Sequence, residues 1–478
     1  MIIRLLILLF FIPFCSYGQS DMINLSLKES SKILKDKNYL LKITDKSLGI
    51  AKTERTKLNS FWYPQINASG TFMHLSNDIE VRQSLKVLTD PAQEFIKTIL
   101  PDDKIINGLL EQIGSNTLIF PLMKSNLTSV DANVIWPLFT GGKRIYATKL
   151  GKQMVDWAEV NRDETAAAIQ SGLIEAYFGV RVAQKVVEVR DETYNTFKIH
   201  YENALKFEKN GMINRAELLF AKVTMDEAKR ELENAIKQES VAQSALKAML
   251  NIKVPQSINP TSPLFIYKEL PSKDYFKTLI SNSSYAINKL NIEVLMAKNQ
   301  KRINQSAYLP IISLIGKQTL YSNNVPKYLV PRTMVGVAFT WNIFDGLSRE
   351  ANIRQAKISQ DMLQLGKQKA EADLSVIIDE LYSKIDGALD DITALNTSLE
   401  MSKELLRIRL KSFQEGMATS TEVIDAKTVL SKIEIAFLLA YYQYDSALAS
   451  LLSVCGVTDT FWQYCDKGTK ENYVFSNK

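Results

Sequence analysis

Two hydrophobic patterns alternate along this chain and predict two kinds of element. From Gln65 to His74 single apolar and polar residues alternate, which is typical of a β-strand with one apolar and one polar face. The same alternation returns at about residues 127–136, 311–318 and 333–341. Stretches of about ten residues have the length that a tilted membrane β-strand needs. The sequence therefore predicts four strands that can cross a membrane.

The second pattern is a spacing of four and three residues over long segments. From Ile169 to Ala204 ten of eleven such positions are apolar, and Leu374 to Arg409 follow the same spacing. A sustained repeat of 3.5 residues predicts coiled-coil packing. A helix from Gly141 to Asn210 would be roughly 100 Å long at 1.5 Å per residue. An ordinary coiled-coil rod would show the same pattern without the strands.

An offset of 205 residues relates the two halves of the chain. It brings Trp136 onto Trp341, Phe139 onto Phe344 and Gly141 onto Gly346. The same offset matches these further residues: Tyr177 with Tyr382, Gly211-Met212 with Gly416-Met417, Glu217 with Glu422, and Ala221-Lys222 with Ala426-Lys427. An ungapped match over this distance indicates an internal duplication.

The duplication divides the chain into two copies of one unit. We expect the copies at 19–250 and 273–456, joined by a connector at 251–272 that holds four prolines. In each copy a helical hairpin follows the strands, at 141–250 and 346–455. Residues 22–60 also read as helical, whereas the tail at 457–478 reads as short and irregular.

Each helical hairpin is expected to turn at a glycine. Gly211-Met212 and Gly416-Met417 lie where the first helix of each pair should end, and glycine takes the left-handed cap conformation at least cost. Asn214 in the first copy, and Thr419 or Ser420 in the second, can cap the returning helix.

Aromatic residues gather where strands meet helices. They are Trp62, Tyr63, Trp136, Phe139, Trp341 and Phe344. Amphipathic rings at one level are typical of a membrane-interface girdle. Soluble hairpins packed on helices are the alternative. Single-chain barrels begin at eight strands, and an open sheet in hydrocarbon leaves backbone groups unpaired, so membrane strands here require several copies in one barrel.

The connections between paired strands differ in length. The second, roughly Thr319 to Arg332, is short, whereas the first, at 75–126, is long and contains helical stretches around Pro91 to Gly114. Because barrels of this kind have short periplasmic turns and longer outer loops, we expect the long loop on the extracellular side.

The ends of the chain indicate export. Residues 1–18 read as a secretory signal peptide, with a membrane anchor and a lipoprotein site at Cys15 as the alternatives. In an oxidising compartment Cys455 and Cys465 are a candidate disulfide. The formal charge of +6 comes from interleaved acids and bases and gives no nucleic-acid signature.

The sequence offers little for catalysis. The only two histidines, His74 and His200, lie in different predicted elements, and no spacing suggests a metal or cofactor site. Gly141-Gly142-Lys143 lacks the rest of a phosphate-binding loop. We therefore expect no enzyme.

One group of acids is a candidate for function. Glu422 and Asp425 are three residues apart at the start of the returning helix, and therefore on one face. Glu217 matches Glu422 in the first copy, where Phe220 replaces Asp425. Such acids favour the helix dipole. Alternatively, once copies assemble, they form a ring that selects and gates.

These residues together resemble the TolC family of outer-membrane channel proteins over nearly the whole mature chain. The resemblance rests on the duplication, on Trp136-Pro137-Leu138-Phe139 with its counterpart Trp341 to Gly346, and on the tip from Phe413 through Asp425-Ala426. It implies a mainly α-helical, internally duplicated fold. Three copies would share a twelve-stranded β-barrel in the outer membrane and form a trimeric α-helical tunnel in the periplasm.

The resemblance also implies partners and site residues. A periplasmic adaptor (membrane fusion) protein and an inner-membrane transporter would dock at the helical tips, with acids at the positions of Glu422 and Asp425 narrowing the aperture. Glutamate at 422 departs from the family pattern. We expect a passive efflux duct in contact with outer-membrane lipid. The outlet of a type I protein secretion system and a periplasmic coiled-coil scaffold without a pore are the alternatives.

Overall fold

A computed structural model describes residues 22–101, 103–253, 255–324 and 331–470. The predicted signal peptide at 1–18 lies outside these residues. The chain divides into two compact units. One contains the residues up to Ala51, Met154–Leu295 and those from Asp361 onward; the other contains Lys52–Gln153 and Met296–Gln360. The first unit is mainly helical, and the second holds the principal sheet.

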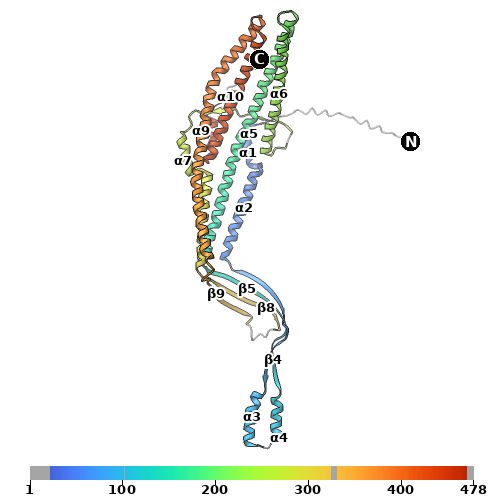
Figure 1. Cartoon of the computed structure of the whole chain (residues 1–478), viewed down its shortest axis with the longest axis vertical. Coiled ribbons are helices and arrows are strands. Elements are labelled where there is room, and N and C mark those ends of the chain that lie inside the picture. Colours follow the sequence, from blue (N-terminus) through green and yellow to red (C-terminus); the bar gives the residue numbers. More distant parts are fainter. Residues whose placement is uncertain (1–21, 102, 254, 325–330, 471–478) are drawn as a thin grey trace, which may run out of the picture. The chain divides into compact units, whose positions relative to one another are not determined.

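Two long helical hairpins dominate the first unit (Figure 1). The first consists of α5 (Lys143–Lys209) and α6 (Arg215–Leu250), and the second of α9 (Ser348–Gln414) and α10 (Ser420–Val454). Both α5 and α9 have 67 residues and begin 205 residues apart. The duplication seen in the sequence is therefore also present in the secondary structure.

The backbone repeats the duplication at the turns. Left-handed residues occur in matched pairs at the same offset, with these φ angles: Gly141 and Gly346 at 63° and 69°, Gly142 and Leu347 at 90° and 68°, Gly211 and Gly416 at 71° and 75°, and Asn251 and Gly456 at 52° and 73°. Because L-residues avoid this conformation, four matched pairs indicate that the copies begin and end their helices in the same way.

The segment at 22–60 is mainly helical, as expected, and is divided into two helices after a short strand. It contains β1 (Ile23–Leu25), α1 (Leu27–Lys37) and α2 (Tyr39–Asn59). Asn38 separates the helices: its backbone N–H donates to the Leu34 carbonyl, while its side-chain oxygen accepts from the N–H groups of Leu40 and Leu41. The same asparagine therefore ends α1 and caps α2.

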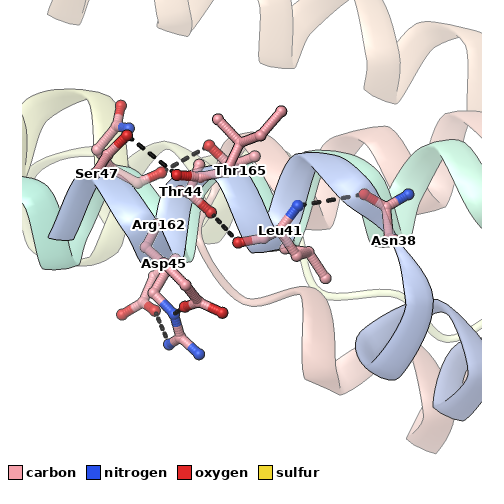
Figure 2. A network of polar contacts seen from close by, with 10 residues as sticks. Asn38, Leu41, Thr44, Asp45, Ser47, Arg162 and Thr165 are labelled. Carbon is pink, nitrogen blue, oxygen red and sulfur yellow. Dashed lines mark hydrogen bonds and ion pairs between the residues drawn. The ribbon is translucent and has the colours of Figure 1, made fainter. Parts of the chain in front are cut away.

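Helix α2 lies beside α5 in the first unit (Figure 2). Arg162 of α5 donates to the carboxylate of Asp45 at 2.6 Å, and Thr44 and Ser47 donate to carbonyls within α2. The two hydroxyl groups donate within α2, and the ion pair between Arg162 and Asp45 is a polar link between α2 and α5.

The connector and the tail also form regular elements. β6 (Ile258–Pro260) pairs in parallel with β1, and β7 (Phe265–Ile266) pairs with β10 (Thr469–Lys470). The prediction of an irregular tail was wrong, because η3 (Thr458–Thr460) and α11 (Phe461–Lys467) precede β10. Phe461 is 1% exposed and packs edge-on against Phe265 at 5.5 Å. Burial of this aromatic side chain fixes the tail on the core.

The remaining helices of the second repeat precede its strands. They are α7 (Lys273–Ser283) and α8 (Tyr285–Gln305).

The duplicated tyrosines hold neighbouring segments: Tyr177 donates to the Leu25 carbonyl at 2.7 Å, and Tyr382 donates to the Pro271 carbonyl at 3.1 Å. The copies thus use matched side chains to fix the N-terminal strand and the connector.

The four predicted strands form one antiparallel sheet in the second unit. They are β2 (Gln65–His74), β5 (Asn126–Thr140), β8 (Ile311–Asn323) and β9 (Thr333–Thr340), in the order β2-β5-β8-β9. β5 and β8 extend four and five residues beyond their predicted ends, and Trp341 lies just after β9. Within the described residues, no helix has the length and apolar character to cross a bilayer.

The long connection between β2 and β5 has its own structure (Figure 1). β3 (Ile79–Ser84) and β4 (Thr117–Met123) form a two-stranded ribbon that carries α3 (Lys86–Ile99) and α4 (Lys104–Gly114). The helices occupy the region where helical stretches were expected, whereas the ribbon was not foreseen.

The candidate disulfide is absent, and both cysteines are free thiols. Cys455 is fully buried and donates to the Phe276 carbonyl, with 3.7 Å between sulfur and oxygen. Burial raises the pKa of Cys455 to about 12 and also raises the pKa of Cys465. A spacing of ten residues did not position these side chains for bonding.

Substitution at the second tip turn tests the role of its glycine. An added Cβ at Gly416 meets open space, so only the left-handed backbone opposes Gly416→Ala. We expect a loss of about 1–2 kcal/mol in the free energy of unfolding. Gly366→Ala in α9, also in open space but helical, should stabilise by about 0.5–1 kcal/mol. Chemical denaturation in detergent measures both; destabilisation by both substitutions would refute the conformational explanation.

Candidate channel wall and helical tips

The sheet has two exposed faces and two open edges. Every residue of β2 is exposed, and on β9 Val335 and Val337 are 74% and 66% exposed. In the sheet that the described residues form, β2 and β9 each have a neighbour on one side only. An exposed strand edge presents unpaired backbone N–H and C=O groups, so each edge is available to a strand of another chain.

The apolar and polar faces of the sheet are distinct. Ile66 and Phe72 of β2 are 70% and 69% exposed and alternate with Asn67, Ser69 and Thr71. The polar residues are linked across strands: the Asn133 amide donates to Ser69 Oγ at 3.2 Å. Apolar residues without a covering layer on one face and hydrogen-bonded polar residues on the other suit a wall between lipid and water.

An acid and a base are paired across the central strands. Asp131 of β5 lies 2.9 Å from Lys317 Nζ of β8 and accepts a hydrogen bond from Thr319 at 2.7 Å. The Asp131 side chain is 9% exposed and that of Lys317 is 38% exposed. This ion pair stands at a register shift between β5 and β8, where the ladder is irregular.

Matched tryptophans join strands to helices at one end of the sheet. Trp136 Nε1 donates to the Trp62 carbonyl at 3.0 Å, and Trp341 Nε1 donates to the Tyr308 carbonyl at 3.1 Å. Their acceptors end the short helices η1 (Ser60–Trp62) and η2 (Ser306–Tyr308). The two repeats of the chain therefore use the same indole hydrogen bond at the same junction between strand and helix.

Two arginines complete these junctions, and the sequence had not assigned them a role. The Arg144 guanidinium stacks over Trp62 at 4.4 Å, and that of Arg349 over Tyr308 at 4.8 Å. Arg349 also donates to the carbonyls of Asn342 and Ile343, each at 2.8 Å. Their match at the 205-residue offset was the signal that could have revealed them.

All six residues of the predicted girdle are exposed. The exposed fractions are 42% for Trp62, 68% for Tyr63, 39% for Trp136, 42% for Phe139, 49% for Trp341 and 73% for Phe344. Large aromatic side chains left in contact with solvent at the end of a sheet match the composition of an interface belt. Contact with lipid stays a prediction.

The helical tips have the expected turns. Met212 and Met417 donate from their backbone N–H groups to the carbonyls of Phe207 and Ser412, each at 2.8 Å, with the left-handed Gly211 and Gly416 before them. This is the Schellman arrangement, which satisfies carbonyls at a helix end. Met212 and Met417 are 60% and 72% exposed. Each tip therefore presents a flexible apolar side chain outward.

The acids at the tips have different surroundings. Glu422 accepts from Arg409 at 2.6 Å, whereas Asp425 is exposed one turn further along α10. Glu217, at the other tip, accepts from the amide of Asn214 at 3.2 Å. Asn214 and Thr419 cap α6 and α10 as expected. Within a single chain the structure thus places Glu422 and Asp425 on one helix and Glu217 on the other hairpin.

Arg409 was overlooked by the sequence reasoning. It interrupts the apolar spacing of α9 at the position where α5 has the fully buried Ala204. A single charged residue in an apolar series indicates a charged partner nearby, and Glu422 is that partner.

In the described part of the chain, no three His, Cys, Asp or Glu side chains are grouped to hold a metal ion.

Two polar contacts join the hairpins near the tips, each with at least one buried partner. His200 Nε2 of α5 lies 2.5 Å from Ser420 Oγ of α10, and its ring packs on Phe413 at 4.5 Å. Lys427 of α10 is fully buried and pairs with Glu192 of α5 at 2.7 Å. Burial lowers the pKa of His200 to about 4. Within one chain, the contact between the two repeats near the tips is therefore made by polar residues as well as apolar ones.

Comparison with protein families gives a match over the second half of the chain. The model of the family described as "Outer membrane efflux protein" matches residues 279–457. This range runs from α7 through α10 and includes β8, β9 and the second tip. No curated protein matches the chain.

Comparison with solved structures extends the likeness to most of the chain. CusC aligns with a TM-score of 0.71 at 16% identity, covering 90% of this chain and 92% of CusC. VceC of Vibrio cholerae aligns with a TM-score of 0.69 at 14% identity, covering 90% of this chain and 96% of VceC. The open state of MtrE of Neisseria gonorrhoeae aligns with a TM-score of 0.68 at 17% identity, covering 90% of this chain and 89% of MtrE.

The chain has the fold of the TolC-family channels. The predicted resemblance and fold class, mainly helical with a strand-and-helix duplication, are confirmed. Proteins of the outer membrane efflux family are channels, in agreement with the prediction that this TolC-like chain is not an enzyme. Twelve strands, three copies and the roles of individual tip residues remain predictions.

Acid should weaken the contact made by His200. The ordinary histidine pKa is 6.5, and in the folded chain it is about 4, so the unfolded chain binds a proton first as pH falls. Stability is therefore lost between pH 6.5 and pH 4, by up to about 3 kcal/mol. The substitution His200→Gln should remove this loss of stability. The substitution His74→Gln, at an exposed histidine, should leave the loss unchanged. Denaturation midpoints in detergent at pH 7.5 and 4.5 measure the effect; equal losses with and without His200 would contradict it.

Proposed function

We propose that this chain is one protomer of a passive outer-membrane efflux channel. The observation that carries the proposal is the four-stranded sheet with both faces exposed and both edges open. Backbone groups must be paired inside a membrane, so a sheet of this kind is stable there only as part of a closed barrel. Three copies would supply twelve strands.

The helices support the same lateral association. Exposed apolar residues lie along two of the long helices, α6 and α9. They are Leu219, Phe220, Val223, Ile236 and Val241 on α6, and Ile358, Met362, Leu365, Val376, Met401 and Ile408 on α9. By contrast, α10 has 19 buried residues against eight in α6. Neighbouring copies that bring α6 and α9 together would cover these residues and complete the wall of a helical tunnel.

The proposed channel takes its energy from elsewhere. A periplasmic adaptor and an inner-membrane transporter are the partners that this architecture implies, with the exposed Met212 and Met417 at the turns as contacts. Methionine suits such a surface because its side chain adapts to different partners. Substrate would leave the periplasmic part through the barrel without any bond being made or broken.

Asp425 and Glu422 are proposed to line the periplasmic aperture. Asp425 is exposed, so three copies would place three carboxylates in contact with the permeating solution. Glu422 is partly neutralised by Arg409, and its loss would release a positive charge at the same place. The two acids therefore have different expected effects on cations.

Neutralisation of Asp425 tests the channel and its aperture together. In planar bilayers the full chain should conduct, and Asp425→Asn should raise the multivalent-cation concentration for half block about tenfold, the equivalent of 1.4 kcal/mol. Glu422→Gln should weaken block further, because Arg409 is then unpaired.

The matched control is Glu380→Gln. Glu380 is a surface acid of α9 that pairs with Lys384 at 2.7 Å, far along the helix from the turn. Its substitution should leave block unchanged. No conductance from the unsubstituted protein would reject the channel, whereas normal conductance with unchanged block in Asp425→Asn would assign the acids to helix capping alone.

A further inference from the structure

The helical hairpin α3–α4 has its larger apolar side chains on the outside. On α3, Val87, Leu88, Phe95 and Ile99 are 59–71% exposed; on α4, Ile105, Leu109 and Ile113 are 42–76% exposed. They recur at helical spacing, which produces one apolar stripe on each helix. A stripe of this kind on a surface helix normally faces a core.

The contact between α3 and α4 is instead made by small and polar residues. Thr89 and Gly114 are both buried, and a Cβ added at Gly114 would collide with Thr89 Oγ1. The Gln93 amide donates to the Asn107 carbonyl at 3.2 Å. Ile96 and Leu110, on the same helix faces as Thr89 and Gly114, are half-buried. The larger apolar residues of the two stripes lie outside this contact, which leaves them for another partner.

The opposite side of the hairpin is charged. On α3 the exposed charged residues Lys86, Asp90 and Lys97 lie within one arc of the helix, opposite Phe95, and Glu94 lies at the edge of this arc, next to Val87. Each apolar stripe flanks the α3–α4 contact. Because the helices are antiparallel, the two stripes lie on the same side of the pair, and the hairpin has one apolar and one charged face.

The ribbon fixes this hairpin to the open edge of the sheet. β3 follows β2 after four residues, and Leu75 N–H donates to the Ser125 carbonyl at 2.7 Å, where β4 leads into β5. β2 is the edge strand to which another copy would pair. Copies that close a barrel therefore each carry a hairpin on the same rim, next to its counterparts.

The composition of the hairpin argues against a lipid surface as the occupant. Residues 86–114 contain three lysines and five acids. Helices that bind in a membrane interface are rich in Lys and Arg on the polar face and attract anionic lipid. An acidic hairpin is repelled by such a surface, so its counterpart in another copy is the better match.

We propose that the apolar faces of the α3–α4 hairpins from the copies of one channel pack on one another, as a helical cap beyond the barrel rim. This inference rests on the proposed function, because a closed ring of copies is what brings the hairpins together. The cap would cover the outer mouth with an apolar helical cluster that the exported substrate has to pass.

Disulfide cross-linking of the full chain in outer membranes tests the cap. Phe95→Cys places a thiol on the apolar face, and Lys97→Cys, two residues further along α3, places one on the charged face. On mild oxidation Phe95→Cys should shift from monomer to covalent dimer in non-reducing denaturing electrophoresis, because one disulfide joins two of three chains. Lys97→Cys and the unsubstituted chain, with its free Cys455 and Cys465, should stay monomeric.

A second pair on α4 and an accessibility measurement make the result decisive. Leu109→Cys and Glu111→Cys repeat the comparison on the two faces of α4. If both apolar positions stay monomeric while the native mass in detergent is that of a trimer, the cap is wrong and the channel stands. If the introduced thiols then react with a water-soluble maleimide, the apolar face is open to water. If they are protected from the maleimide, the apolar face is covered by lipid. A monomeric native mass would reject the channel and the cap together.

Discussion

The constraint on which this structure depends is the pairing of backbone groups at the edges of the sheet. Within the described residues of one chain, the four strands have exposed faces and the sheet has two unpaired edges. A membrane penalises each unpaired N–H or C=O group by several kcal/mol, and water allows uncontrolled association at such edges. The exposed apolar residues of α6 and α9 impose a similar requirement on the helices. Both requirements are met when the edges and helices of neighbouring copies cover one another.

The strands, the long helices and the duplication were predictable because each depends on a local pattern. Alternation gives strands, spacing of four and three gives helices, and the paired glycines give the turns. The apolar spacing from Leu374 to Arg409 agrees well with the buried residues of α9, among them Ile378, Ile385, Ile392, Leu399 and Leu406. The matching spacing from Ile169 to Ala204 describes α5 less well around Leu173 to Val182, because Ile174, Tyr177 and Phe178, which lie outside the spacing, are also buried. The helix there is covered on several sides, and a single stripe cannot describe it.

What the sequence did not predict depends on contacts between distant residues. The pairs His200–Ser420, Glu192–Lys427 and Arg409–Glu422 join different helices, and no local pattern places them together. The short strands β1 and β10 exist because partners from the connector lie beside them. Cys455 and Cys465, close in sequence, remain free because Cys455 is buried against Phe276. The tip acids were found from the sequence, but the ion pair that distinguishes Glu422 from Asp425 depends on Arg409.

The most direct test of the account is a structure of the full chain extracted from membranes and reconstituted in lipid. The account predicts that β2 of each copy is hydrogen-bonded to β9 of the next, so that three copies close a barrel with its apolar face in lipid. A single chain whose β2 and β9 edges lie in water, or whose sheet folds against its own helices, would contradict it.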